Sequence, residues 1–134
     1  DAGDDKIAGG TGNDKIYGGI GKDILTGDSG ADSFVFDTKP GSANIDTITD
    51  FIAKDDTILL DHDIFTKAGA VGHLNAAAFY VGSAAHDTSD RIIYDKTNGK
   101  LWYDADGNGG GAAVQFASLS KGLTLTSTDF DIIA

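Results

Sequence analysis

Gly9–Tyr17 reads GGTGNDKIY, Gly18–Thr26 reads GGIGKDILT and Gly27–Val35 reads GDSGADSFV, so one nine-residue pattern occurs three times in succession. Residues 1–8, DAGDDKIA, are a fourth copy that lacks the first place. Every copy has glycine at the fourth place, aspartate at the sixth and a large apolar residue at the eighth. These residues are Gly3, Gly12, Gly21 and Gly30, then Asp5, Asp14, Asp23 and Asp32, then Ile7, Ile16, Leu25 and Phe34. This regular short period predicts a stacked-repeat fold.

Each copy is expected to form a glycine-rich turn of six residues followed by a strand of three residues. Glycine permits the positive φ angles that a tight turn requires. Two copies make one coil of a parallel β-roll, so turns that lie 18 residues apart in the sequence stack on each other. The apolar residues of the eighth place are expected to fill the interior of the roll.

The stacked turns offer only oxygen atoms to a cation. Carbonyls of an extended turn point alternately to opposite sides, so a cation between two turns would meet about six oxygens, four from carbonyls and two from carboxylates, which suits calcium. Magnesium needs a tighter octahedron, and softer metals need histidine or cysteine, which the turns lack. The alternative is a metal-free scaffold of glycine and aspartate turns. That alternative leaves the sixth-place carboxylates to repel one another.

The pattern GGxGxDxUx, with U a large apolar residue, resembles the calcium-binding repeats of RTX proteins. The resemblance implies calcium ions between alternate turns of a parallel β-roll. One implied site combines the carbonyls of Asp1, Gly3, Gly18 and Ile20 with the carboxylates of Asp5 and Asp23. The other combines the carbonyls of Gly10, Gly12, Gly27 and Ser29 with the carboxylates of Asp14 and Asp32.

Some turn carbonyls have no partner in this scheme. Gly9 and Thr11 would need an earlier turn, whereas Gly19 and Gly21 would need a downstream partner, for which Asp37 and Asp46 are the candidates. The pattern also has departures, with Asp28 at the second place and Lys22 at the fifth. We expect these two residues to weaken calcium affinity rather than abolish it.

The rest of the chain reads as β-structure. Strands are expected at 45–51, 57–61, 91–95, 101–104, 113–116 and 123–125, and a short helix at 74–79. Asn98-Gly99 predicts a hairpin with a type I′ turn. The order GADSFVF, DTITDF, DDTILLD resembles the segment that caps the β-roll of serralysin-type secreted metalloproteases. The expected fold is all-β: a short parallel β-roll over residues 1–36, then a capping β-sandwich-like region over residues 37–134 with one or two short helices.

The two ends of the sequence bear on export. The chain opens Asp1-Ala2-Gly3 without a methionine, a basic segment or an apolar segment, so we expect no secretory signal peptide and a piece of a longer protein. The terminal STDFDIIA, residues 127–134, resembles the C-terminal signal of type I secretion substrates. The alternative for the same residues is a last edge strand, and the two interpretations are compatible.

Composition excludes several classes of protein. All 21 acidic residues are aspartate, only 10 residues are basic and the net charge is −11, so binding to nucleic acid or to an anionic membrane surface is not expected. Without cysteine there is no disulfide framework and no thiolate metal site. No apolar run is long enough to span a bilayer. The absence of glutamate, a good helix former, and the 19 glycines favour a loop-rich β-protein.

A second candidate for calcium lies in the loop Asp104-Ala-Asp106-Gly-Asn108-Gly. Oxygen-bearing side chains at places one, three and five and glycine at place six are typical of an EF-hand loop. Place twelve would be Gln115 rather than glutamate, and the flanking segments read as strands. A glycine-rich β-turn without metal is the alternative.

No catalytic constellation stands out. The stretch GDSG at residues 27–30 is reminiscent of a serine-protease loop, but the repeat frame explains it. His62, His73 and His86 lack the spacing of a zinc protease motif, which also requires glutamate. Paired aspartates could hydrolyse glycosides, yet the densest pairs occupy the predicted metal turns.

The sequence therefore predicts a non-catalytic, calcium-binding C-terminal module of a larger secreted, extracellular RTX protein. It is expected to cross the bacterial type I secretion apparatus and to fold on binding calcium outside the cell. Two alternatives remain open. One is an adhesion or polysaccharide-binding module, which a concave row of exposed aromatic residues near Tyr94, Trp102 and Tyr103 would favour, although strand alternation places part of that set in the core. The other is the terminal fragment of a secreted protease, lipase or alginate-modifying enzyme.

Overall fold

Two β-sheets make up the computed structural model, which describes residues 1–134 throughout. The first sheet has the strand order β1 (Lys6–Ala8), β3 (Ile24–Thr26), β5 (Asp46–Ile48), β11 (Val114–Ser118), β10 (Lys100–Tyr103), β9 (Ile92–Asp95) and β8 (Phe79–Val81). The second has the order β2 (Lys15–Tyr17), β4 (Ser33–Phe36), β6 (Thr57–Asp61), β12 (Phe130–Ile133) and β7 (Gly72–His73). Two single-turn 3₁₀ helices, η1 (Ala76–Ala78) and η2 (Ser127–Asp129), complete the fold.

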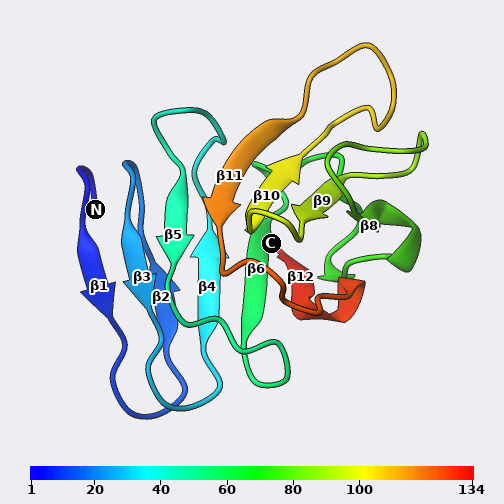
Figure 1. The fold of residues 1–134 in the computed structure, drawn as a ribbon. Coiled ribbons are helices and arrows are strands. Elements are labelled where there is room, and N and C mark those ends of the chain that lie inside the picture. Colours follow the sequence, from blue (N-terminus) through cyan, green and yellow to red (C-terminus); the bar gives the residue numbers. More distant parts are fainter.

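The strands β1 to β6 form a parallel β-roll, because the chain alternates between the two sheets as it coils (Figure 1). Ile7 of β1 is paired with Leu25 of β3, and Ile16 of β2 with Phe34 of β4, which is the predicted offset of two repeats. Short strands suit this arrangement, since three residues span one layer before the next glycine turn reverses the chain. The predicted all-β fold with a parallel roll is confirmed.

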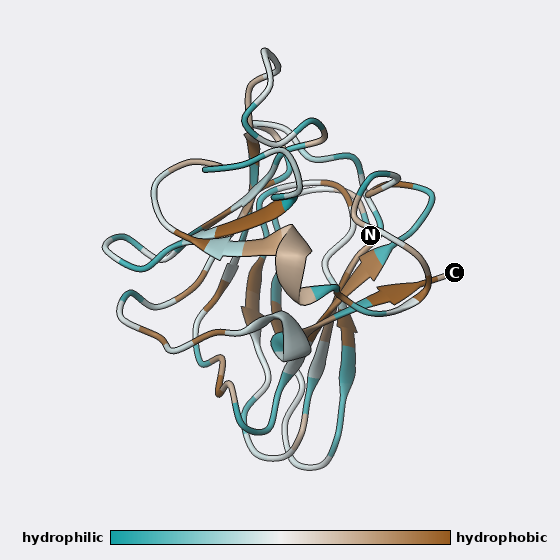
Figure 2. Cartoon of the chain, turned by 90° about the vertical axis from the view of Figure 1, so that its right-hand side faces the viewer, coloured by the Kyte–Doolittle hydropathy of each residue, from teal (hydrophilic) through white to brown (hydrophobic).

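The eighth-place residues lie inside the roll, as expected. Leu25 and Phe34 have no exposed surface, Ile16 is 4% exposed and Ile7 packs partly buried against the same core. Apolar residues follow the strands and polar residues the connecting turns (Figure 2). Burial of apolar surface contributes about 25 cal/mol per Å², so this interior stabilises the roll. It does not compensate the negative charges of the turns, which lie outside it.

The roll extends beyond the last glycine-rich copy. Asp46-Thr-Ile48 and Asp56-Thr-Ile58 repeat the aspartate and apolar places without the glycines before them. Strand β5 pairs in parallel with β3, and β6 with β4, so both sheets run across the boundary between residues 36 and 37 without a break. The division of the chain into residues 1–36 and 37–134 stays a prediction from the repeat pattern.

The remaining strands extend both sheets of the roll. Strand β11 pairs in parallel with β5, and the antiparallel set β9–β10–β11 continues the first sheet. Strand β12 pairs in parallel with β6 and antiparallel with β7, so it lies inside the second sheet. The alternative of a last edge strand at residues 127–134 is therefore wrong. Burial explains the position, because Phe130 and Ile132 are almost fully enclosed.

Three local expectations need correction. The hairpin at Asn98-Gly99 exists, but its loop covers residues 96–99 and only Gly99 has a positive φ, because the Asp95 side chain accepts hydrogen bonds from within the loop. Leu123–Leu125 is not a strand, since the backbone N–H of Leu123 donates to the hydroxyl of Tyr94 rather than to a strand. The helix expected at 74–79 is the single turn η1, which Asn75 caps.

Tyr94 links the cap to the segment before β12. Its side chain is fully buried, and its hydroxyl donates to the carbonyl of Ser120 (2.6 Å) and accepts from the N–H of Leu123 (3.1 Å). We expect Tyr94→Phe to lower the free energy of unfolding by about 1–3 kcal/mol, because both backbone groups lose their partner in a buried place. Urea denaturation with and without calcium checks this, and the loss should be the same in both. A loss seen only with calcium would contradict it.

Candidate metal centre

The glycine turns stack in two pairs. Asp1–Asp5 lies on Gly18–Asp23, where the N–H of Gly3 donates to the carbonyl of Ile20 (2.8 Å) and the N–H of Ile20 donates to the carbonyl of Asp1 (2.9 Å). Gly9–Asp14 lies on Gly27–Asp32 through the equivalent bonds, Gly12 to Ser29 (2.9 Å) and Ser29 to Gly10 (3.1 Å). The structure thus brings together both groups of residues that the RTX resemblance implied.

Sixth-place aspartates form a ladder along each stack. The N–H of Asp5 donates to Oδ1 of Asp23 (2.8 Å), and the N–H of Asp23 donates to Oδ1 of Asp46 (3.0 Å). We call Asp5, Asp23 and Asp46 the first ladder. The second ladder repeats these bonds on the other side of the roll, and its members are Asp14, Asp32 and Asp56, with distances of 2.9 and 3.0 Å.

Four carboxylate oxygens in the ladders are buried without any hydrogen-bond partner. They are the Oδ2 atoms of Asp5, Asp14, Asp23 and Asp32, the four sixth-place residues of the repeats. A buried charged oxygen without a partner is costly, and a cation is the usual compensation. Because these turns offer carbonyl and carboxylate oxygens and contain no histidine or cysteine, they fit calcium and not metals that prefer nitrogen or sulfur.

Glycine is required in these turns by close approach of the neighbouring chain. A Cβ on Gly21 would lie 2.3 Å from the carbonyl oxygen of Gly3, and one on Gly30 would lie 2.0 Å from that of Gly12. At the first place, a Cβ on Gly18 or Gly27 would lie 2.4 or 2.3 Å from Oδ2 of the same turn's aspartate. The glycines therefore leave the room in which carbonyls and carboxylates converge.

The two ladders end differently. Asp46 is 5% exposed, its Oδ1 accepts from Asp23, and the structure shows no hydrogen bond to its Oδ2. Burial, with the negative charges of Asp23 and Asp37, raises the pKa of Asp46 to about 7. Asp56 closes the second ladder, because its Oδ1 accepts from Asp32 and its Oδ2 from the N–H of Ile52 (2.9 Å); burial raises its pKa as well.

The candidate ligands outside the two implied calcium sites have different surroundings. The carbonyl of Gly19 accepts from the Thr38 hydroxyl (3.2 Å), and the N–H of Gly21 donates to Asn44 (3.0 Å), so both face the segment that leads to Asp46. Gly9 and Thr11 belong to the turn between β1 and β2, which stacks on Gly27–Asp32 on one side. Because β1 and β2 are the terminal strands of the two sheets, no turn of this chain covers its other side. Asp37 is exposed.

Sequence reasoning missed Asp50 and Asp56. Asp50 accepts from the N–H groups of Gly27 (2.9 Å) and Asp28 (2.7 Å), and this supports the positive φ of +66° at Asp28. The available signal for Asp56 was the half-repeat of aspartate, one residue and a large apolar residue, which it shares with Asp46. Asp46 and Asp56 follow the preceding aspartate of their ladder by 23 and 24 residues, whereas the paired aspartates of the glycine copies lie 18 residues apart. The fixed period therefore does not predict Asp56.

The loop with Asp104, Asp106 and Asn108 is only partly assembled. The N–H of Asp106 donates to Oδ1 of Asp104 (3.3 Å), and burial raises the pKa of Asp104, whereas a hydrogen bond from Gly111 lowers that of Asp106. The Asn108 side chain instead donates to the carbonyl of His86 (3.3 Å). The structure brings the two aspartates together and ties Asn108 to a neighbouring loop, so calcium in this loop stays a prediction.

The aromatic residues of the adhesion alternative do not form a single row. Tyr94 is buried in the core, whereas Trp102 lines a hollow of about 280 Å³. The other lining residues are Ser42, Ile45, Ala113, Val114 and Gln115. Trp102 is the single aromatic residue of that hollow, so ligand binding there stays a prediction.

Comparison with known protein families gives one match. A family model of the RTX calcium-binding nonapeptide repeat, in four copies, covers residues 1–34. No curated protein matches the chain. No helix of the fold has the length and apolar character needed to cross a membrane. Residues 1–34 therefore match RTX calcium-binding nonapeptide repeats, and this match supports an RTX-type domain.

Proposed function

We propose that the chain is a calcium-dependent folding module in which two ions join the stacked repeats. One ion would bind the carbonyls and carboxylates of Asp1, Gly3, Asp5, Gly18, Ile20 and Asp23, and the other those of Gly10, Gly12, Asp14, Gly27, Ser29 and Asp32. The observation that carries this proposal is the set of four buried Oδ2 atoms without a hydrogen bond. All four belong to these two groups, and a doubly charged ion shared by two of them would offset the cost of their burial.

A third ion would continue the first ladder between Gly19, Gly21, Asp23 and Asp46. Asp46 supports this extension because it is almost fully buried and the structure shows no hydrogen bond to its Oδ2. The second ladder would not extend, since Asp56 already accepts a hydrogen bond at each of its two oxygens. The roll would then hold more calcium on one side than on the other.

Coupling to calcium would make folding depend on the compartment. Where calcium is scarce, the aligned carboxylates would repel one another and the repeats would stay disordered. Sites of extracellular modules typically have Kd values of about 10⁻⁴–10⁻³ M, so binding would occur outside the cell. Because the ligands converge only when the turns stack, binding and folding would be one reaction. This behaviour suits a non-catalytic C-terminal module of a larger secreted RTX protein.

Export would have to precede folding if residues 127–134 carry the type I secretion signal. In the folded chain, Phe130 and Ile132 of β12 are buried, and β12 pairs with strands on both sides. A receptor could not read these residues in the folded state without opening the sheet. We therefore propose that the export apparatus recognises the chain while calcium is absent.

We expect Asp32→Asn to lower calcium affinity by at least about tenfold, because calcium affinity follows the number of charged ligands. The asparagine can still accept the hydrogen bond from the N–H of Asp14 through its Oδ1. In EDTA, where the repeats of the parent are expected to be disordered, the variant should be at least as ordered as the parent, because its folded form buries one unpaired charge fewer. Circular dichroism, in a calcium titration and in EDTA, measures the two effects.

Asp56→Asn is the matched control. Asp56 accepts the same kind of bond at Oδ1, but its Oδ2 accepts from the N–H of Ile52. An asparagine NH₂ group cannot accept that bond, so this variant should be destabilised by about 1–3 kcal/mol both with and without calcium. Equal calcium affinity in Asp32→Asn and the parent would overturn the proposed ligand assignment.

A further inference from the structure

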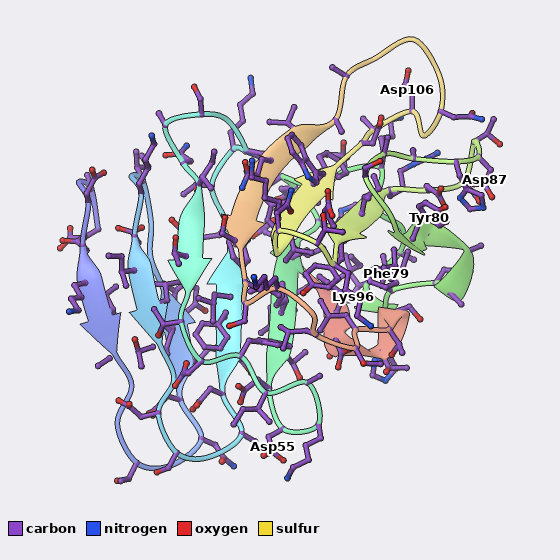
Figure 3. All side chains as sticks on the ribbon, in the orientation of Figure 1. Asp55, Phe79, Tyr80, Asp87, Lys96 and Asp106 are labelled. Atoms are coloured by element: carbon purple, nitrogen blue, oxygen red, sulfur yellow. The ribbon has the colours of Figure 1, made fainter.

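We propose that His86 and Asp87 bind a divalent transition metal of the zinc type, at a site separate from the calcium-binding turns. Both residues lie in the loop 82–91 between β8 and β9, and Asp90 lies beside them. The candidate ligand atoms of these three residues lie within 4.8 Å of one another. Asp87 and Tyr80 occupy the end of the molecule opposite β1 (Figure 3).

Asp90 sets which nitrogen of His86 is free. Its side chain is 1% exposed, and its Oδ2 accepts from the backbone N–H of His86 (2.8 Å) and lies 2.5 Å from His86 Nδ1. A carboxylate oxygen accepts a hydrogen bond from Nδ1, so a neutral His86 ring would carry its proton on Nδ1 and leave the lone pair of Nε2 for a metal. A carboxylate behind a histidine in this way orients many metal-binding histidines.

Asp87 presents a free oxygen to that lone pair. Its Oδ1 accepts from the N–H (2.9 Å) and the hydroxyl (2.8 Å) of Ser89 and from the N–H of Asp90 (3.1 Å). These bonds hold the pKa of Asp87 below its usual value, so the carboxylate is ionised at neutral pH. Its Oδ2 lies 3.6 Å from His86 Nε2.

The 3.6 Å separation is too long for a hydrogen bond. Two ligands about 2.0–2.1 Å from a tetrahedral zinc ion lie about 3.3–3.4 Å apart, so the two atoms would have to approach by only about 0.2–0.3 Å to bind one ion. A nitrogen lone pair and a carboxylate oxygen that face each other repel unless a cation lies between them. A metal ion at this place would bind Nε2 and Oδ2, with water in the remaining positions.

Neighbouring elements hold the two ligands in place. The His86 ring stacks on Tyr80 of β8, with centroids 3.9 Å apart and planes 20° apart. On the other side, the N–H of Asn108 donates to the carbonyl of Asp87 (2.9 Å). Because the loop is held from two sides, little conformational entropy remains to be lost on binding. The mixed nitrogen and oxygen donors favour zinc over calcium, which takes oxygen ligands.

Isothermal titration of the full chain with zinc chloride, in saturating calcium, tests the site. We expect Asp87→Asn to lower zinc affinity by at least about tenfold. The asparagine keeps Oδ1 for Ser89 but replaces the free oxygen by NH₂. His86→Ala should have the same effect. The control is His73→Ala: His73 forms a similar pair with Asp131 (2.5 Å), but no second carboxylate faces its ring, so zinc affinity should not change.

The protonation of His86 provides a second readout. Long-range ¹H–¹⁵N NMR of the metal-free chain, at a pH where the ring is neutral, should show the proton on Nδ1, and zinc should shift the Nε2 resonance. The proposal is overturned if the neutral ring carries its proton on Nε2, since that nitrogen would then have no lone pair for the metal. It is equally overturned if Asp87→Asn binds zinc like the parent, or if His73→Ala abolishes binding.

Discussion

Removing calcium with EDTA should unfold the repeats of residues 1–34 and raise amide hydrogen exchange in β1 to β4 to the rate of a disordered chain. The physical cause is the burial of four unpaired carboxylate oxygens along the two aspartate ladders. An ion that binds only the folded state stabilises it by about 2.7 kcal/mol at a free concentration of 100 Kd. Two such ions supply about 5 kcal/mol, which is comparable with the whole stability of a small domain.

Circular dichroism and hydrogen exchange followed by mass spectrometry measure this loss. Calcium should restore the parent spectrum, whereas magnesium should not, because it is too small for the site and keeps its own waters. Strands β9 to β11 have no ladder aspartate next to them in sequence and should lose protection less than β1 to β4. An unchanged spectrum and unchanged exchange in EDTA would show that the roll folds without metal.

Gly30→Ala should be the most damaging small substitution in the roll. Gly30 has a φ of +132°, and a Cβ there would lie 2.0 Å from the carbonyl oxygen of Gly12. The strained backbone alone costs about 1–3 kcal/mol. The clash adds to that cost because the Gly12 carbonyl must move away from the stacked turn, and it is a proposed calcium ligand. We expect a total loss of about 4 kcal/mol or more in calcium, and weaker calcium binding.

Gly12→Ala separates the two causes. Gly12 holds the same fourth place with a φ of +108°, but a Cβ there would meet nothing within 4 Å. This variant should lose only the cost of the strained backbone, about 1–3 kcal/mol, and its calcium affinity should fall less than that of Gly30→Ala. Urea denaturation in calcium compares the two variants. Equal losses would mean that close stacking of the turns contributes little to the roll.

The β-roll and its oxygen chemistry could be predicted because the repeat encodes them locally. Glycine at the fourth place, aspartate at the sixth and an apolar residue at the eighth each act within one turn or one strand, so Leu25 and Phe34 were correctly placed in the interior. The pairing of turns 18 residues apart follows from the period itself. The RTX match over residues 1–34 covers the same stretch.

The tertiary structure alone determined how the ladders end and how the cap continues the roll. Asp46 and Asp56 join the ladders across spacings without a fixed period, because the loops before them differ in length. Strand β12 lies between β6 and β7, since pairing with segments about 70 and 60 residues away buries Phe130 and Ile132. Such contacts depend on the packing of the whole chain. A repeat is specified within nine residues, whereas these contacts are specified only once the chain has folded.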